Sequence, residues 1–424
     1  KKRRKDGDIM KKMKVDLAVI GGGPAGMAAA LEAKRQGVEK VIIIERDKKL
    51  GGILQQCIHD GFGIQRFGER LAGTEYAQRF IDQIKESDIE VLLETMVIEM
   101  TPEKEIYACS GKHGMVYLTC GAIVAAMGCR ERTASQVLLY GKRPAGVYTA
   151  GSVQRFINME GYLPGKEAVI LGSGDIGLIM ARRMTLEGIK VKGVYEVMSS
   201  PGGLTRNIVQ CLEDYEIPLT LSATVKEIHG KERIEGVTVA KLDENREVIE
   251  GTEEYIACDL LVLAVGLIPE NELSKGAGIP LDAKTKGPVL DENFMTDIPG
   301  IFAAGNVSVV YDLVDYVSQS GEIAARGAAA YLSGKDRGEK ESNEVVAGEN
   351  VNFVVPEKIR RGEKEEVSFF LRVTKPLKKI KVEVVQNGAV LASKQLPHGA
   401  PPEMIFIDSP VGAQGPVTVQ VREV

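Results

Sequence analysis

Residues 17–46 read LAVIGGGPAGMAAALEAKRQGVEKVIIIER, in which a G-x-G-x-x-G motif separates two apolar runs. The first run, Val15–Ile20, is short and apolar, which is typical of a buried strand. Gly21 allows a tight turn after such a strand, Gly23 lets main-chain N–H groups approach a pyrophosphate, and Gly26 lets the next helix pack closely. The segment therefore predicts a strand–turn–helix unit that binds a dinucleotide.

The residues around the motif fit the same unit. Pro24 suits the first turn of the helix, where its missing N–H is not needed. The N-terminus of that helix would face the phosphates with the positive end of its dipole. Glu45 ends the second apolar run, 22 residues after Gly23 (45 minus 23). A carboxylate at this place can accept hydrogen bonds from ribose hydroxyls.

A second copy of the layout follows in residues 169–197, VILGSGDIGLIMARRMTLEGIKVKGVYEV. Its glycines are Gly172, Gly174 and Gly177, and Glu196 again comes 22 residues after the middle one (196 minus 174). An isolated motif would be weak evidence, because glycine-rich turns are common. Here each motif has its strand, its helix and its acidic residue, so we predict two dinucleotide-binding folds in one chain.

Further apolar runs suggest how these folds are arranged along the chain. Residues 121–132 (GAIVAAMGCRER) and 259–271 (DLLVLAVGLIPEN) occupy matching places after the two motifs. A third run, residues 296–307 (TDIPGIFAAGNV), needs a sheet partner, and the first domain is the one left open. We therefore predict an α/β fold with two Rossmann-like domains, the first discontinuous and the second inserted into it. The expected boundaries are 13–145 and 280–335 for the first domain and 146–279 for the second.

The C-terminal part has a different residue pattern from the two glycine-motif domains. Residues 336–350 are polar and linker-like, whereas residues 351–424 contain short β-type runs separated by turns. Asn387-Gly388 between two such runs is a strong hairpin signal. We expect a small all-β, sandwich-like domain. Its role is either docking or dimer stabilisation, or stability alone.

Composition limits the class of protein. The net charge of −5 implies no general affinity for nucleic acid. Residues 1–14 hold eight basic and two acidic side chains, and we expect residues 1–12 to be a disordered basic extension. The alternatives are a surface-binding arm, or leader sequence upstream of a start at Met10 or Met13. The longest apolar run, Leu260–Ile268, is too short to span a bilayer, and the six cysteines show no metal-binding spacing. We expect a cytoplasmic protein without a transmembrane segment or a metal site.

With its three motifs in this order, the chain resembles the FAD- and NAD(P)-binding oxidoreductases of the pyridine nucleotide–disulfide reductase superfamily over about residues 13–335. The resemblance implies that the first site holds the ADP half of FAD and that the second holds NAD(P). The implied FAD positions are Gly21, Gly23, Pro24, Ala25, Gly26, Glu45, Arg46, Gly52, Val97, Ala126, Gly128, Gly305, Asn306 and Val314, and the implied NAD positions are Gly172, Gly174, Asp175, Ile176, Gly177, Glu196 and Gly266.

The third motif departs from the superfamily pattern. Such proteins usually carry Gly-Asp, whose aspartate bonds the ribityl chain of the flavin, whereas this chain has Gly305-Asn306. An amide still bonds a hydroxyl, so FAD binding is expected to survive. The helix beginning near residues 312–314 would aim its N-terminus at the flavin edge where negative charge develops on reduction.

The redox dithiol of the superfamily is also missing. Glutathione-reductase-like enzymes carry C-x-x-x-x-C just after the second strand, and thioredoxin reductases carry C-x-x-C in the NADPH domain. This chain has LGGILQQCIHDGFG at residues 50–63, with Cys57 as its one thiol, so disulfide reduction is not expected. Cys57 and His59 are weak catalytic candidates, as a charge-transfer thiolate or a proton donor. The interpretation we favour is that Cys57 packs while His59 and Asp60 bond the loop backbone.

Four stretches narrow the resemblance: residues 50–63, 71–80 (LAGTEYAQRF), 201–219 (PGGLTRNIVQCLEDYEIPL) and 313–329 (LVDYVSQSGEIAARGAA). They are similar to flavoprotein subunits found beside anaerobic-type glycerol-3-phosphate dehydrogenase, and more distantly to large subunits of opine, proline and cyanide-forming glycine dehydrogenases. This implies an electron-transfer subunit that works with a partner flavoprotein dehydrogenase, a small cysteine-rich redox subunit, or both, and that can form a homodimer. The alternatives are a stand-alone NADH oxidase or diaphorase, and a non-catalytic FAD-containing assembly subunit.

The coenzyme preference depends on the end of the second fold, VKGVYEVMSSPGG (residues 191–203). A carboxylate at Glu196 suits the ribose hydroxyls of NADH and repels the 2′-phosphate of NADPH. Sites for NADPH usually place arginines just after this strand, whereas here the first basic side chain is Arg206. We therefore expect NADH to be preferred, unless Glu196 points to solvent and selects nothing.

Overall fold

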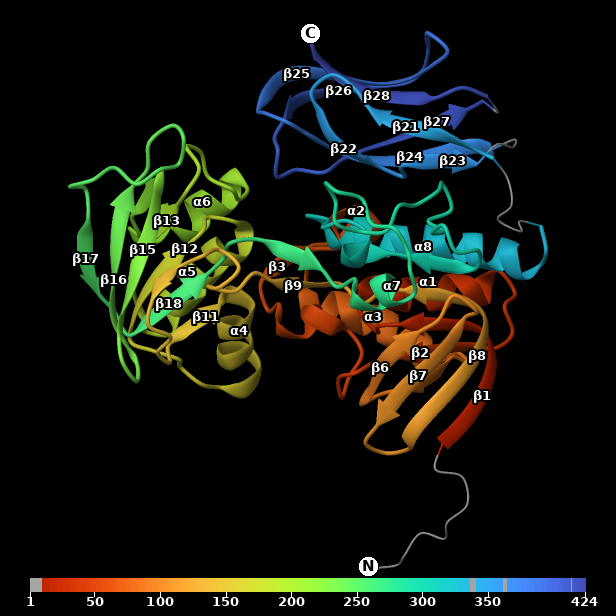
Figure 1. Ribbon diagram of the computed structural model, residues 1–424, viewed down its shortest axis with the longest axis horizontal. Helices are drawn as coiled ribbons and strands as arrows, with labels where there is room; N and C mark the ends of the chain where they lie inside the picture. The colour runs from red at the N-terminus through yellow and green to blue at the C-terminus, as the bar shows by residue number, and fades with distance from the viewer. Residues whose placement is uncertain (1–9, 336–340, 361–363, 413) are drawn as a thin grey trace, which may run out of the picture. The chain divides into compact units, whose positions relative to one another are not determined.

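We describe the protein from a computed structural model of the chain, which describes residues 10–335, 341–360, 364–412 and 414–424. The chain divides into two compact units, traced in chain order by colour in Figure 1. The first unit contains the residues up to Gln55, together with Asp60–Cys129 and Pro269–Val424. The second contains Gln56–His59 and Arg130–Ile268.

The first unit is built on a seven-stranded mixed sheet around β1 (Met10–Ile20). β1 pairs in parallel with β2 (Val41–Ile44) and with β8 (Gly114–Ala125). All four residues of β2 are apolar and buried, as expected for a strand covered on both faces. The sheet order is β5–β2–β1–β8–β7–β6, where β5 is Glu90–Leu92, β6 is Thr95–Met100 and β7 is Glu105–Ser110.

The third apolar run of the sequence returns to this sheet. β20 (Ile301–Ala303) pairs in parallel with β8, in the register Phe302 opposite Val124. The prediction that the first domain is discontinuous is therefore confirmed. The chain passes between the units along β9 (Cys129–Glu131) and β19 (Leu267–Pro269), which pair with each other.

Side chains of β1 alternate between two apolar cores, as the period of a strand requires. Leu17 and Val19 belong to a core shared with α1 (Pro24–Arg35), α3 (Gly73–Lys85) and α8 (Val314–Leu332). Ala18 and Ile20 belong to the core on the other face. The remaining short elements of this unit are η1 (Gly52–Gln56), β3 (Asp60–Phe62), α2 (Ile64–Phe67), β4 (Leu71–Ala72), α7 (Glu272–Gly276) and η4 (Gly305–Val307).

The helices of the first unit are held together through α8 (Figure 1). α1 consists largely of small residues, so α8 approaches it until a side chain at Gly321 would overlap the main-chain carbonyl of Ala25. The hydroxyls of Tyr76 on α3 and Ser318 on α8 are hydrogen bonded at 2.8 Å. Arg66 on α2 forms an ion pair with Glu322 on α8.

The second unit contains a five-stranded sheet in which all pairings are parallel, in the order β11–β18–β12–β13–β14. Its strands are β11 (Val147–Thr149), β18 (Leu260–Leu263), β12 (Glu167–Leu171), β13 (Lys190–Glu196) and β14 (Leu219–Leu221). Its helical elements are α4 (Ala150–Arg155), η2 (Phe156–Glu160), α5 (Asp175–Leu186), α6 (Thr205–Cys211) and η3 (Glu213–Tyr215). A second sheet follows the order β10–β15–β16–β17 and comprises β10 (Tyr140–Gly141), β15 (Ala223–Gly230), β16 (Ile234–Lys241) and β17 (Glu254–Ala257).

The C-terminal residues form two packed β-sheets. One has the order β23–β21–β28–β25–β26 and comprises β23 (Lys358–Arg360), β21 (Ser342–Ala347), β28 (Val417–Glu423), β25 (Leu377–Gln386) and β26 (Ala389–Gly399). The other has the order β22–β24–β27 and comprises β22 (Val351–Val355), β24 (Lys364–Val373) and β27 (Ile405–Val411). Asn387 and Gly388 both have positive φ, at 51° and 78°, in the turn that joins β25 to β26. This is the geometry of a tight hairpin, so the sandwich and its hairpin are confirmed.

The predicted fold class is thus confirmed. Three boundaries along the chain, those of the second unit, of the N-terminal extension and of the linker, differ from the expected ones. The chain enters the second unit at Arg130 and leaves it at Ile268. Most of the basic N-terminal segment, residues 1–9, lies outside the described residues, and residues 10–12 form the start of β1, where Met10 lies opposite Met115 of β8. Residues 342–347, expected in the linker, form β21, because pairing with β23 and β28 stabilises a strand that the local sequence barely indicates.

The close approach of α1 and α8 should make the stability of the protein sensitive to a side chain at Gly321. A Gly321→Ala substitution should lower the free energy of unfolding by about 1–3 kcal/mol, the usual effect of overpacking a tight contact. The reason is that the new methyl group meets main-chain atoms of Ala25, which cannot rotate away. The measurement is chemical denaturation of the two proteins.

Gly276→Ala is the matched control. Gly276 ends α7, and a Cβ at this position has no neighbour within 4 Å. This substitution should change the free energy of unfolding by less than about 1 kcal/mol. Equal stability of the Gly321→Ala protein and the wild type would contradict the described packing of the two helices.

Candidate functional site

The first glycine motif forms the loop between β1 and α1. Gly21 has φ +104°, and a side chain there would overlap the main-chain carbonyl of Ala126 at the end of β8. Gly26 stands against the carbonyl of Gly21, so the third glycine lets α1 begin directly on the turn. A Cβ at Gly23, in contrast, would meet nothing within 4 Å. The first and third glycines are therefore required by packing, and the middle one leaves the loop open on one side.

The second glycine motif repeats this arrangement between β12 and α5. Gly172 has φ +99°, and a side chain there would overlap the carbonyl of Ala264, which follows β18. A Cβ at Gly177 would lie 2.7 Å from the carbonyl oxygen of Gly172. A Cβ at Gly174 would have one neighbour, the Ala264 oxygen at 3.9 Å. The three glycines of the two loops therefore match in packing as well as in spacing.

The acidic residue at the first loop is buried and bonded to it. Glu45 is 6% exposed. Its Oε2 accepts a hydrogen bond from the main-chain N–H of Gly22 at 2.7 Å, and its Oε1 accepts one from the N–H of Asp47 at 2.8 Å. A carboxylate oxygen can accept more than one hydrogen bond. Glu45 therefore holds the loop and still has capacity to bind a hydroxyl of a ligand.

Glu196 occupies the corresponding place in the second loop with the same contacts. It is also 6% exposed, its Oε2 accepts from the N–H of Ser173 at 2.8 Å, and its Oε1 accepts from the N–H of Met198 at 2.9 Å. Here Ser173 adds a bond that the first loop lacks, because its hydroxyl donates to Glu196 Oε2 at 2.6 Å and accepts from the N–H of Gly202 at 2.8 Å. Ser173 is a site residue that the sequence analysis missed, and its place between Gly172 and Gly174 was the available signal.

The third motif lies next to the first loop. The N–H of Gly305 donates to the hydroxyl of Ser320 on α8 at 2.8 Å. Asn306 accepts at Oδ1 from the N–H of Tyr311 at 3.0 Å and donates from Nδ2 to the sulfur of Cys129 at 3.5 Å. The asparagine amide thus connects η4 to the segment that leads into α8.

The structure gathers many of the expected first-site residues around one loop. Pro24 and Ala25 begin α1. A Cβ at Gly305 would lie 2.7 Å from the Cβ of Ala25. A Cβ at Gly52 would lie 3.1 Å from the Cα of Gly23. Two expected positions have other surroundings: Arg46 is exposed, and Val97 is buried in the core on the opposite face of the sheet. The remaining expected residues are Gly128 and Gly266, with φ of 75° and 103°, Val314, which begins α8, and Asp175 and Ile176, which begin α5.

Asp175 has structural partners in the second unit. Its Oδ1 accepts hydrogen bonds from the N–H of Leu204 at 2.9 Å and from the side-chain amide of Asn207 at 2.6 Å. These bonds attach the start of α6 to the start of α5. Asp175 therefore organises the loop that follows β13 beside Gly174.

Cys57 lies in a buried polar cluster of the second unit. The side-chain amide of Gln56 donates to the carbonyl oxygen of Gly151 at 2.9 Å and to Gln154 Oε1 at 3.0 Å. The Cys57 sulfur lies 3.9 Å from the same Gln154 oxygen and donates to it. Burial raises the pKa of Cys57 to about 12, so its thiol is neutral at physiological pH. His59, the other weak candidate, is half-buried in the same segment.

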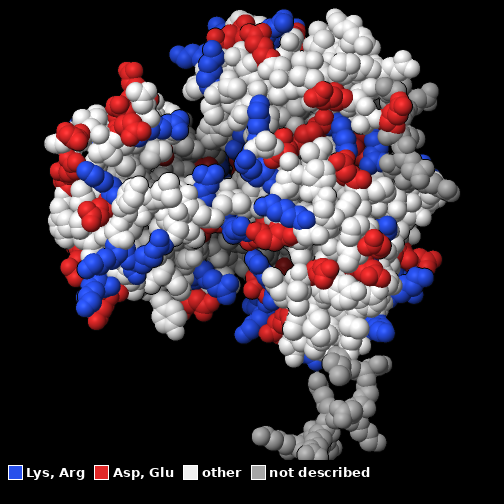
Figure 2. Space-filling model, viewed as in Figure 1, with Lys and Arg blue, Asp and Glu red and all other residues white. Residues whose placement is uncertain are grey.

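Several further features bear on the class of protein. The six cysteines are present as thiols in the described residues. In the part of the chain that the structure describes, no group of three or more His, Cys, Asp or Glu side chains could hold a metal ion. No helix among the described residues is long and apolar enough to cross a membrane. On the face shown in Figure 2, acidic and basic side chains are interspersed.

Two Rossmann-like units with matching glycine loops define the class of two-dinucleotide reductases, and comparison with known proteins agrees. The model of the pyridine nucleotide-disulphide oxidoreductase family matches residues 15–323, and the chain belongs to this family. The chain is 26% identical to hydrogen cyanide synthase subunit HcnB of Pseudomonas protegens over 76% of its own length and 69% of the relative's. It is 27% identical to an NADH dehydrogenase of Bacillus subtilis over 75% of its length, but it spans 58% of that protein. A crystal structure of T. acidophilum thioredoxin reductase has a similar fold, with a TM-score of 0.61 and 22% identity over 75% of this chain and 98% of that one.

Family membership establishes the cofactors and the broad activity. Members of the family bind FAD and NAD(P)H. The chain is accordingly an FAD-dependent NAD(P)H oxidoreductase, as the sequence analysis expected. The residues described above fit such ligands, because each loop combines an open middle glycine with a buried carboxylate that has acceptor capacity left.

The raised pKa of Cys57 predicts its reactivity. The thiolate is the nucleophilic form of cysteine, so Cys57 should be alkylated by iodoacetamide at pH 8 much more slowly than Cys109, which is exposed on β7. Peptide mass mapping of a time course measures both rates. In denaturant the two thiols should react alike. Fast labelling of Cys57 in the native protein would contradict a buried neutral thiol and support a thiolate role.

Proposed function

We propose that the first glycine loop binds the ADP part of FAD and that the second binds NAD(H). The observation that carries this proposal is the shared arrangement of the two loops, in which the three glycines have matching roles and a buried glutamate accepts hydrogen bonds from two main-chain N–H groups. When bound, the two cofactors supply the hydride chemistry. The chain contributes binding and orientation: Gly23 and Gly174 give main-chain atoms access to a pyrophosphate, and the glutamates bind ribose hydroxyls.

The contacts of Glu196 support a preference for NADH. Its carboxylate is held at the loop by three hydrogen bonds from Ser173 and Met198, so it is not a mobile surface group. Residues 197–205 contain no basic side chain that could pair with a 2′-phosphate. A fixed carboxylate that is followed by nine residues without a basic side chain disfavours NADPH.

The first test is anaerobic reduction of the bound flavin. NADH should bleach the flavin absorbance with a much higher kcat/KM than NADPH. Glu196→Ala should narrow this difference mainly by raising KM for NADH, about tenfold or more, because it removes a charged acceptor of the ribose hydroxyls. Stopped-flow spectroscopy with both coenzymes measures each effect.

The duplication provides the control. Glu45→Ala should lower the amount of FAD retained per chain and leave the dissociation constant of NADH unchanged. Glu196→Ala should instead raise the dissociation constant of NADH and leave the amount of retained FAD unchanged. Wild-type protein that stays colourless after FAD is added would contradict the proposal as a whole. Equal efficiency with NADH and NADPH would contradict the role of Glu196 alone.

We further propose that the protein works as a subunit of a dehydrogenase complex. Hydrogen cyanide synthase subunit HcnB, to which the chain is similar, is by its name a subunit. Residues 50–63 contain a single cysteine, Cys57, so the sequence offers no dithiol relay there, and electrons that pass through the flavin need another acceptor or donor. The sequence resemblance favours a glycerol-3-phosphate dehydrogenase-type flavoprotein, a small cysteine-rich redox subunit, or both. A second candidate function is a stand-alone NADH oxidase or diaphorase. The similarity to an NADH dehydrogenase supports it.

Purification from the native host distinguishes these two candidates. A tagged copy expressed at its normal level should bring down a second dehydrogenase subunit in fixed ratio, and the complex should reduce its acceptor faster than the isolated chain. Mass spectrometry identifies the partner. Recovery of the chain alone, with NADH oxidase or diaphorase activity equal to that of the cell extract, would contradict the subunit role.

A further inference from the structure

The three-stranded sheet of the C-terminal sandwich has apolar side chains packed on both of its faces. Along β24, Phe369 and Leu371 belong to the core of the sandwich, whereas Phe370 belongs to the core that contains α1 and α8. Along β27, Ile405 and Ile407 belong to the sandwich core, and Phe406 packs against the other. Successive side chains of a strand point to opposite faces. The sandwich therefore presents one face of this sheet to the domain that carries the first glycine loop.

That face contacts the segment between the third motif and α8. The Phe370 ring lies 5.3 Å from the ring of Tyr311 and 5.8 Å from that of Tyr316, measured between centroids. Phe406 stacks on Tyr316 at 5.9 Å. Aromatic pairs at these separations attract one another beyond the burial of their surface. Tyr311 and Tyr316, which flank the start of α8, are both held by the sandwich.

Two polar contacts hold the same segment, one at its main chain and one at the Asp312 side chain. Arg372, on the Phe370 side of β24, donates from Nη2 to the carbonyl oxygen of Val310 at 3.0 Å. The main-chain N–H of Met404 donates to Asp312 Oδ2 at 3.0 Å. Burial raises the pKa of Asp312 and lowers that of Arg372, and each charge partly offsets the shift of the other. Both groups are half-buried, and their contacts hold residues 310–312 against the sandwich.

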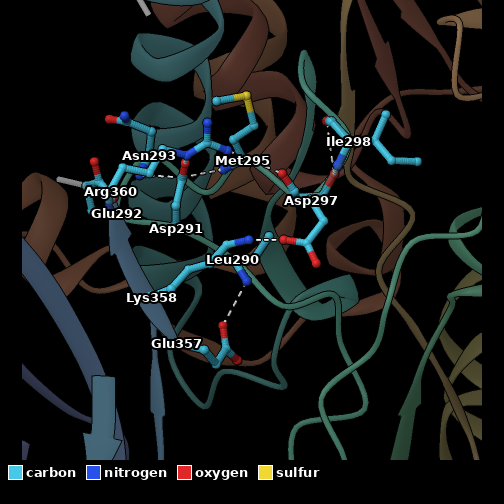
Figure 3. Close-up of polar contacts among 11 residues, drawn as sticks. Leu290, Asp291, Glu292, Asn293, Met295, Asp297, Ile298, Glu357, Lys358 and Arg360 are labelled. Atoms are coloured by element: carbon cyan, nitrogen blue, oxygen red, sulfur yellow. Dashed lines mark hydrogen bonds and ion pairs between the residues drawn. The ribbon is translucent and has the colours of Figure 1, made fainter. Parts of the chain in front are cut away.

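A second set of contacts prevents the sandwich from turning about this point (Figure 3). Arg360 on β23 forms an ion pair with Asp291, and its N–H donates to Glu292 Oε2 at 2.9 Å. Glu357 and Leu290 exchange two hydrogen bonds, from the Leu290 N–H to Glu357 Oε2 at 2.9 Å and from the Glu357 N–H to the Leu290 oxygen at 3.1 Å. Two separate attachments define the orientation of the sandwich on the domain that carries the first loop.

We propose that the C-terminal sandwich is a positioning element for the FAD site, acting through Arg372. By holding residues 310–312, it fixes the N–H of Tyr311 that bonds Asn306 and the point at which α8 begins. Asn306 and the N-terminus of α8 are the groups expected to face the flavin. This inference rests on the proposed function, because it assigns a purpose to the sandwich only if the first loop binds FAD.

The test replaces Arg372 and follows the bound flavin. In Arg372→Met, loss of a buried charge-assisted hydrogen bond should weaken FAD binding about tenfold. It should also shift the visible spectrum and the midpoint potential of the remaining bound flavin, because Asn306 and α8 are no longer fixed. The dissociation constant of NADH should not change, since Arg372 and the second loop lie in different units. Arg372→Lys, which keeps a cationic donor, should restore much of the FAD affinity.

Arg422→Met is the matched control. Arg422 is a half-exposed arginine of β28 whose ion-pair partners, Glu349 and Glu383, belong to the sandwich itself. Its FAD affinity, flavin spectrum and midpoint potential should equal those of the wild type. If Arg372→Met does not fold, Arg372→Gln, which loses the charge and much of the reach, carries the same expectation.

The outcomes separate this inference from the proposed function. An Arg372 variant that melts at a lower temperature but binds FAD with unchanged affinity, spectrum and potential would overturn the positioning role and leave the sandwich a stability module. Wild-type protein that takes up no FAD would instead contradict the proposed function itself. A shifted flavin spectrum in Arg372→Met, with wild-type behaviour of Arg422→Met, is the expected result.

Discussion

The carbonyl oxygens of Ala126 and Ala264 lie in the space that a side chain would need at Gly21 and Gly172. This steric constraint determines the rest of each glycine loop. Because the chain can turn so tightly at the first glycine, the helix starts directly after it, and the third glycine rests on the carbonyl of the first. The middle glycine then remains on the open side of the loop, and the buried glutamate can reach the N–H next to it. The shape of each loop thus depends on the absence of a side chain at its first glycine.

The family to which the chain belongs is named for disulfide chemistry, but this chain keeps the fold and the nucleotide loops without the dithiol. The Cys57 thiol donates to Gln154, and burial raises the pKa of Cys57 to about 12. The thiolate is the form of cysteine that attacks a disulfide, so a buried thiol that stays protonated is a poor participant in thiol–disulfide exchange. The same scaffold can serve different acceptors because the cofactors carry the chemistry and the chain determines which group approaches them.

The junction between the sandwich and the first domain is polar to a degree that stability alone does not require. Arg360 and Asp291 are buried there and Glu357 is half-buried, and desolvation raises the pKa of Asp291 to about 6 and that of Glu357 to about 8. Apolar side chains in their place could bury the same surface without desolvating charges. Directional contacts instead hold the sandwich in one orientation, as a positioning role demands.

The two glycine motifs, their strands and their glutamates were evident from residue order, because the covalent spacing of 22 residues and the steric needs of glycine are local properties. The return of residues 296–307 to the first sheet could also be inferred, since a buried strand must have a neighbour. The hairpin at Asn387-Gly388 is likewise local. Three features could not be predicted from residue order. They are Ser173 as a bridge from Glu196 to Gly202, β21 within the expected linker, and the packing of both faces of β24. Each depends on groups that are distant in the chain and meet only when the sheets have packed, so it is the tertiary structure that assigns their partners.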